Sequence, residues 1–166
     1  MVKPMPGSAR RLLLTVAAVW SVAACHLCCR STVALSAECP GSGESLQGDV
    51  AVYAGTAGGV VAAVAAARMQ AGARVIVINP TGHLGGMVSG GLGRTDGHPS
   101  GGIAQEFFDR VGGLTFSPSM AEAVFDSWAT NESLIVAHDC QAVEVQKDAA
   151  NNRVLSLKTA AGGTVT

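Results

Sequence analysis

The chain has 166 residues, enough for one domain, and its formal net charge at pH 7 is only −1. The charges are unevenly placed, because four of the eleven basic residues and no acidic residue lie in the first 37 positions, which leaves a net charge of −5 on the remainder. A body this acidic argues against nucleic acid and anionic membranes as partners.

Residues 1–37 have the pattern of a secretory signal peptide. Lys3, Arg10 and Arg11 precede an apolar run over 12–24, and small residues follow over 31–37. The run is shorter than the roughly 20 residues of a membrane span. We therefore expect cleavage between about Ala34 and Cys39, and a product of the secretory pathway that has no membrane contact afterwards. An uncleaved membrane anchor and a lipoprotein cleavage box at Cys25 remain as alternatives.

Most of the cysteines lie in or beside this segment, at Cys25, Cys28, Cys29 and Cys39. Their CxxCC spacing lacks the second ligand pair of a zinc site, so no metal is expected. Cleavage near Ala37 leaves only Cys39 and Cys140. We predict no disulfide framework, and a thiol packed in the core at Cys140, which lies in an apolar strand.

The segment that follows predicts an α/β domain. A polar stretch rich in Gly, Pro and Ser over 38–48 is typical of a linker. A strand is predicted over 49–54, a turn over 55–59, an Ala/Val-rich helix over 60–71 ended by Gly72, and a continuously apolar strand over 74–78. Strand, Gly-rich turn, helix and strand within about thirty residues form one βαβ unit.

Residues 82–102 contain nine glycines among twenty-one positions. Other side chains are interleaved without the serine-rich monotony of a spacer, and such a density of glycine suits a backbone pressed against a flat ligand. His83 and His98 are candidate proton carriers, and Arg94 and Asp96 are candidate ligand contacts. The simpler interpretations are loop hydrogen bonds and a loop ion pair.

The last third predicts two helices and a small β-meander. A short amphipathic helix is expected over 103–111, and a second helix follows with Ser117 as its cap and Pro118 at its first position. Strands are predicted over 134–137, 141–147 and 153–159, with turns over 148–152 and 161–163, and another strand begins at 164–166. We therefore expect an incomplete domain; the alternative is a natural stop with the last strand at a sheet edge. Asn131 is the first residue of an N-glycosylation sequon, Asn131-Glu132-Ser133, in a predicted loop.

The turn after the first strand is a weak dinucleotide fingerprint. Of the GxGxxG glycines, only Gly59 stands in place, because Ala54 and Thr56 occupy the first two positions. The position of the ribose-binding acid is the neutral Asn79. Spacing alone leaves open whether this turn binds a dinucleotide or nothing.

Longer stretches carry a resemblance. VYAGTAGG at 52–59, NPTGHLGGMVSGGLGRTD at 79–96, GGIAQEFF at 101–108 and SPSMAEAVF at 117–125 resemble the N-terminal part of the FAD-dependent oxidoreductase family, over 49–166. The family pattern runs V-Y-G-G-T-P-A-G and then E-P-T-x-x-L-G-G-M. The resemblance implies a Rossmann-like FAD/NAD(P)-binding α/β fold of the glutathione-reductase type, with FAD as cofactor.

The resemblance also implies roles for single residues. It makes the pyrophosphate loop from Gly55, Thr56, Ala57, Gly58 and Gly59. Asn79 takes the ribose position, followed by Pro80 and Thr81. The ribityl chain and the flavin ring would lie along Gly85, Gly86, Met87, Ser89, Gly90 and Gly91. The adenine would meet the backbone of Val143.

In this family, a further flavin-contacting segment and the substrate domain follow the region matched here. We therefore expect a flavin-binding segment that needs a missing C-terminal region. It should lack turnover by itself, and no catalytic residues can be identified in it. Its small-molecule substrate is unknown. One alternative is a fragment of an NAD-binding Rossmann dehydrogenase, against which the Gly-rich segment over 82–102 argues. The other is a truncated, non-catalytic product that binds no cofactor.

Overall fold

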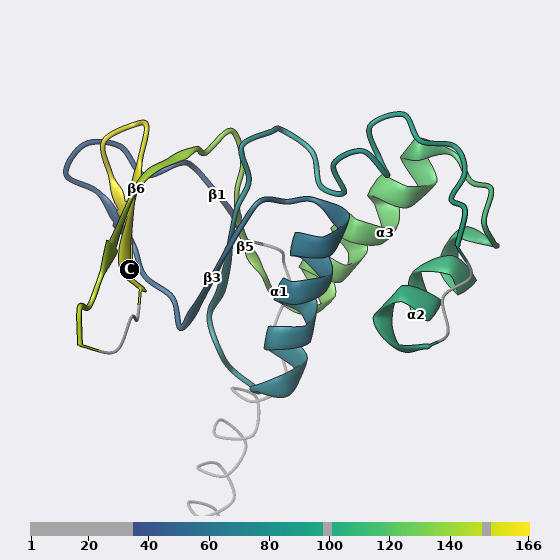
Figure 1. Cartoon of the computed structure of the whole chain (residues 1–166), viewed down its shortest axis with the longest axis horizontal. Coiled ribbons are helices and arrows are strands. Elements are labelled where there is room, and N and C mark those ends of the chain that lie inside the picture. The colour runs from purple at the N-terminus through teal and green to yellow at the C-terminus, as the bar shows by residue number, and fades with distance from the viewer. Residues whose placement is uncertain (1–34, 98–100, 151–153) are drawn as a thin grey trace, which may run out of the picture. The chain divides into compact units, whose positions relative to one another are not determined.

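The computed structural model describes residues 35–97, 101–150 and 154–166. A parallel sheet has the strand order β1 (Leu35–Ala37), β5 (Ile135–Ala137), β4 (Val75–Ile78) and β3 (Val50–Tyr53). The second sheet has the order β2 (Ser45–Leu46), β8 (Thr164–Val165), β7 (Val154–Thr159) and β6 (Ala142–Lys147). Within the described residues the helices are α1 (Ala57–Met69), α2 (Gly102–Val111) and α3 (Pro118–Asn131), which are labelled in Figure 1.

The parallel sheet is the middle layer, which explains why its strands are continuously apolar. On one face, Val75, Val77 and Val136 belong to the hydrophobic cluster that the helices complete. On the other face, Ile76 and Ile78 pack in a cluster with Val165 of the second sheet. The helices and the second sheet lie on opposite sides of the parallel sheet in Figure 1. The predicted α/β class and βαβ unit are confirmed.

The helix boundaries follow local capping chemistry. Helix α1 begins at Ala57 rather than at position 60, because the Thr56 hydroxyl caps it by accepting from the Gly59 amide at 3.2 Å. Helix α3 begins as predicted, with Pro118 in its first turn and the Ser117 hydroxyl accepting from the Met120 amide. Its last residue is the exposed Asn131, which we had predicted in a loop.

A chain of polar contacts joins the three helices. The Arg68 guanidinium of α1 contacts Glu106 of α2 at 2.8 Å and Glu132, the residue after α3, at 2.7 Å. The indole of Trp128 in α3 donates to Glu106 at 3.0 Å. The hydrogen bond from Arg68 holds the pKa of Glu106 below its ordinary value. Because these side chains are partly exposed, their ion pairs add little to the free energy of unfolding and mainly fix the helices relative to one another.

The second sheet contains the predicted meander, since β7 pairs antiparallel with both β6 and β8. The unexpected member is β2, which lies in the polar segment 38–48 and pairs parallel with β8. Residues 45–46 therefore form part of a sheet inside a stretch whose composition is typical of a linker. Of the two predicted turns, the one over 148–152 runs into the undescribed residues 151–153.

The prediction of a free core thiol at Cys140 is wrong. Cys140 forms a disulfide with Cys39, with the two Cα atoms 5.0 Å apart. The reason is that Leu35–Ala37 forms strand β1, which lies parallel beside β5 with Ala37 opposite Ala137. The residues just past the ends of the two strands therefore meet.

Signal-peptide cleavage itself stays a prediction, because residues 1–34, including Cys25, Cys28 and Cys29, lie outside the described residues. None of the helices in the described ranges is both long and apolar enough to cross a membrane.

Candidate functional site

The carboxyl ends of β3, β4 and β5 lie side by side, because the three strands are parallel and in register. The turn at 54–56 follows β3, Asn79 follows β4, and His138 follows β5. This edge of a parallel sheet is where α/β proteins place their ligands.

The turn between β3 and α1 brings the helix very close to the strand. A Cβ added to Gly59 would lie 1.9 Å from the carbonyl oxygen of Ala54, so only glycine allows this approach. A Cβ added to Gly58 would meet no heavy atom within 4 Å. The first turn of α1 is therefore open at Gly58, and its polarised N–H groups can receive a phosphate there.

The start of this turn is conformationally unusual. Ala54 has a φ of +92°, on the side of the backbone map that favours glycine. The next residue, Gly55, is buried against Asn79, since a Cβ there would lie 2.6 Å from the Asn79 Cγ. The family pattern has two glycines at these two positions, and only the first is replaced here.

The Gly-rich segment packs against this turn. The Gly85 amide donates to the Gly55 carbonyl at 2.7 Å, and Thr56 forms a parallel bridge with Gly85. A Cβ on Gly86 would lie 3.3 Å from the Thr56 Cα. The phosphate turn and the start of the Gly-rich segment therefore form one continuous surface.

The other residues assigned to the flavin differ in exposure. Met87 is 78% exposed, and Gly90 and Gly91 are exposed as well, so they can meet a ligand. Ser89 is only 7% exposed, and its hydroxyl donates to the Leu84 carbonyl inside the loop. The Ser89 hydroxyl therefore stabilises the loop from within.

Asn79 is 2% exposed, and its amide is occupied by its own loop. Its Nδ2 donates to the His83 carbonyl at 2.9 Å, and its Oδ1 accepts from the Thr81 hydroxyl at 3.2 Å. Pro80 and Thr81 are exposed. A ribose contact through the Asn79 amide would have to replace these bonds, and the ribose role stays a prediction.

Sequence reasoning missed His138. Its Nδ1 lies 3.3 Å from the Asn79 Nδ2, although the two residues are 59 positions apart. The neighbouring Asp139 has a φ of +51° and is exposed. The strand before His138 was predicted. Its parallel pairing with β4, which creates this contact, cannot be predicted from local sequence patterns.

The remaining candidates are more scattered. His83 is half-buried beside Gly90, with its Nε2 3.4 Å from where a Gly90 Cβ would stand. Arg94 and Asp96 are exposed, and within the described residues they form no salt bridge with each other. Val143 lies on β6 with 59% of its surface exposed, at an irregularity in the β6–β7 register. His98 lies outside the described residues.

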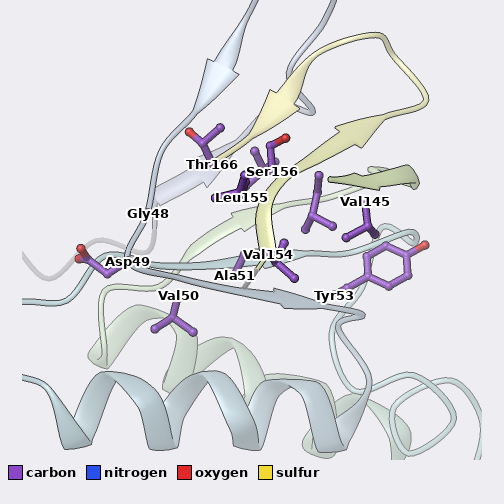
Figure 2. A pocket seen from close by; sticks show the side chains of 12 residues that line it. Gly48, Asp49, Val50, Ala51, Tyr53, Val145, Val154, Leu155, Ser156 and Thr166 are labelled. Atoms are coloured by element: carbon purple, nitrogen blue, oxygen red, sulfur yellow. The ribbon is translucent and has the colours of Figure 1, made fainter. Parts of the chain in front are cut away.

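A cavity of about 590 Å³ lies away from this turn, between β3 and β7. Figure 2 shows Val145, Val154 and Tyr53 among its mostly apolar lining. Its acidic member, Asp49, uses the carboxylate to accept from the Arg74 amide at 2.8 Å. The cavity contains none of the residues predicted to hold a cofactor. No cluster of metal-ligating side chains is found among the described residues.

Solved structures share this fold. The chain matches THI4 from Thermovibrio ammonificans with a TM-score of 0.50 and 20% identity, over 68% of this chain and 47% of that one. It matches thioredoxin reductase from T. acidophilum with a TM-score of 0.51 and 18% identity, over 72% and 32%. It also matches a flavin-containing monooxygenase from Stenotrophomonas maltophilia with a TM-score of 0.51 and 14% identity, over 72% and 36%.

The chain thus spans about a third to a half of the length of these structures. No curated protein matches it. The sequence profile described as FAD dependent oxidoreductase matches residues 49–166. With its Rossmann-like α/β fold and FAD as the family's cofactor, the chain belongs to the FAD-dependent oxidoreductase family.

Proposed function

We propose that the chain holds the adenosine diphosphate half of FAD in a secreted oxidoreductase. The observation that carries this proposal is the turn between β3 and α1. Gly59 lets the helix touch the strand, Thr56 caps the helix, and the space in front of Gly58 is open. A pyrophosphate there would meet backbone N–H donors and the positive end of the helix dipole.

When bound, the flavin would supply hydride chemistry. The chain's own contribution is binding and orientation: the bond from Gly85 to Gly55 fixes the turn against the Gly-rich segment. Because the chain spans only about a third to a half of the solved flavoproteins it matches, we propose that substrate binding and turnover need a further C-terminal region. The purified chain should be colourless or lose flavin on gel filtration, and a stoichiometric retained flavin would contradict this.

Equilibrium titration with ADP, FAD, FMN and NAD tests the proposal. ADP and FAD share the adenosine and pyrophosphate groups, whereas FMN lacks the adenosine half. We expect ADP and FAD to bind and FMN not to bind. Binding of NAD in preference to FAD would favour the dehydrogenase alternative, and no binding of any of the four would favour the product that holds no cofactor.

Gly58 offers a matched pair of variants. Since a Cβ at this position would meet no heavy atom within 4 Å, we expect Gly58→Asp and Gly58→Asn both to fold. An aspartate in the first turn of α1 favours the helix but repels a pyrophosphate. We expect Gly58→Asp to weaken ADP binding at least tenfold more than the uncharged Gly58→Asn does. Equal effects of the two variants would place the phosphate elsewhere.

Secretion is supported by the signal-peptide pattern of residues 1–37 and by the Cys39–Cys140 disulfide, which is typical of oxidising compartments. N-terminal sequencing of secreted protein tests it. We expect a start at Ala34 or Leu35, which keeps the β1 pairing with β5 intact. An intact Met1 outside the cell would contradict cleavage and favour the uncleaved alternative.

A further inference from the structure

Two asparagines of the chain are followed, two positions later, by serine or threonine, and only one of them forms a usable sequon. The triplet Asn-Glu-Ser at 131–133 fits the acceptor pattern N-x-S/T, in which x is any residue except proline. The triplet Asn-Pro-Thr at 79–81 has proline in the middle and is blocked. The structure separates the two asparagines in the same way. Asn79 is 2% exposed and its amide is hydrogen-bonded within its loop, whereas Asn131 is exposed.

Both recognised side chains of the usable sequon lie on the surface. Asn131 is the last residue of α3, and Ser133, in the turn that follows, is exposed as well, with a φ of +55°. The inward contacts of this corner belong to the residues beside them: the Glu132 carboxylate accepts from Arg68 at 2.7 Å, and Leu134 is fully buried. The corner is therefore held in place while Asn131 and Ser133 face solvent.

This corner lies far from the candidate functional site. Glu132 pairs with Arg68 in the last turn of α1, whereas the phosphate turn lies at the first turn of that helix. With a rise of 1.5 Å per residue, Ala57 and Arg68 are about 16 Å apart along the helix axis. The corner also leads into the amino end of β5, and the candidate site follows the carboxyl ends of the strands. A bulky group on Asn131 would therefore leave the phosphate turn open.

We propose that Asn131 is an N-glycosylation site and carries one oligosaccharide in the secreted protein. The donor is a lipid-linked oligosaccharyl pyrophosphate, and the Asn131 Nδ2 attacks C1 of its first sugar. A C1–Nδ2 bond forms as the C1–O bond breaks, the lipid pyrophosphate leaves with the electron pair, and Nδ2 loses one proton. The inference rests on the secretion proposed above and is independent of flavin binding.

The order of residues along the chain allows this transfer to precede folding. When the chain enters a compartment from its N-terminus, Asn131 arrives before Cys140, so the disulfide with Cys39 cannot close first. In the folded chain the helix end is fixed, because the Glu132 amide donates to the Trp128 carbonyl at 2.9 Å. The acceptor is thus presented in an unfolded chain and ends on the surface of the folded one.

Mass spectrometry of the secreted full chain tests the proposal. The wild type, Asn131→Gln and Glu132→Gln would be produced with residues 1–37 in a eukaryotic secretory cell. Each would then be treated with a glycosidase that hydrolyses the bond between the asparagine Cγ and the glycan nitrogen. We expect the wild type to lose the mass of one oligosaccharide and Asn131→Gln to lose nothing. Glu132→Gln keeps the sequon and removes only the ion pair with Arg68, so it should be glycosylated as the wild type is.

A secreted wild type of unmodified mass would overturn the inference, as would a glycan that persists in Asn131→Gln. The location can also be read from the wild type alone, without any variant. Hydrolysis in water enriched in heavy oxygen converts a glycosylated asparagine into a labelled aspartate. We expect the label in the peptide that contains position 131, and a label in any other peptide would refute the assignment.

N-terminal sequencing of the same material separates this inference from the proposal of signal-peptide cleavage. A glycan on a chain that keeps Met1 would contradict cleavage while supporting Asn131 as the acceptor. A processed, secreted chain without a glycan would support cleavage and overturn the glycosylation site.

Discussion

Replacing Ala54 by glycine should make the protein more stable, although alanine-to-glycine changes usually do the opposite. Ala54 has a φ of +92°, where a residue with a Cβ is strained by about 1–3 kcal/mol. Glycine relieves this strain but adds about 0.4–1 kcal/mol of backbone entropy to the unfolded chain. The difference between these two ranges predicts a net gain in the free energy of unfolding of about 0–2.5 kcal/mol for Ala54→Gly, with a central value near 1 kcal/mol.

Urea unfolding of the wild type and the variant, followed by circular dichroism, measures this difference directly. Ala62→Gly is the control, because Ala62 lies exposed within α1 and has ordinary helical geometry. It should lose about 1 kcal/mol. If Ala54→Gly loses stability by a similar amount, the backbone at position 54 does not have a positive φ, and our description of the turn is refuted.

Three further perturbations follow from the contacts described. Removing the disulfide with Cys39→Ala and Cys140→Ala opens a loop with a sequence separation of 101 residues, so the free energy of unfolding should fall by about 2–5 kcal/mol, and unchanged urea midpoints would contradict this. The pKa of Glu106 is lowered in the folded state, so its stabilising effect is present above its ordinary value of 4.5 and is lost as the pH falls through its folded pKa. Wild-type stability should therefore drop more steeply with acidification below about pH 4.5 than that of Glu106→Gln, and parallel curves would show that the pKa of Glu106 is not lowered. Asn79→Asp replaces a buried donor by an acceptor and should cost about 1–3 kcal/mol without tightening ADP binding, whereas tighter binding at unchanged stability would place Asn79 on the ribose.

Much of the fold could be predicted from local patterns in the sequence. The run over 74–78 predicted a strand buried on both faces; the strand forms over Val75–Ile78 with all four residues buried, and Arg74 before it is exposed. Ser117 and Pro118 predicted the start of α3 correctly, because capping depends only on neighbouring residues. The resemblance over 79–96 assigned the Gly-rich segment and the phosphate turn to one cofactor; the Gly85 amide does donate to the Gly55 carbonyl, and the shared cofactor site stays a prediction.

What local patterns could not predict depends on pairing between distant residues. Leu35–Ala37 is too short to be recognised as a strand and becomes one through its neighbour β5. The disulfide of Cys140 follows from that pairing and was missed with it. The same holds for His138, which reaches Asn79 only because β4 and β5 are adjacent. The inward orientation of the Asn79 amide likewise depends on the path of the loop over 81–83.

If the chain is secreted as we propose, the disulfide also imposes an order of events as the chain enters an oxidising compartment from its N-terminus. Cys39 arrives first and must wait until Cys140 has followed, 101 positions later. Until then its nearest thiols are Cys25, Cys28 and Cys29, which offer short, non-native loops that thiol exchange forms readily. Early removal of the proposed signal peptide would take these three competitors away and leave Cys39 and Cys140 as the pair that remains. The timing of leader cleavage would thus decide the fidelity of oxidative folding, apart from any effect on destination.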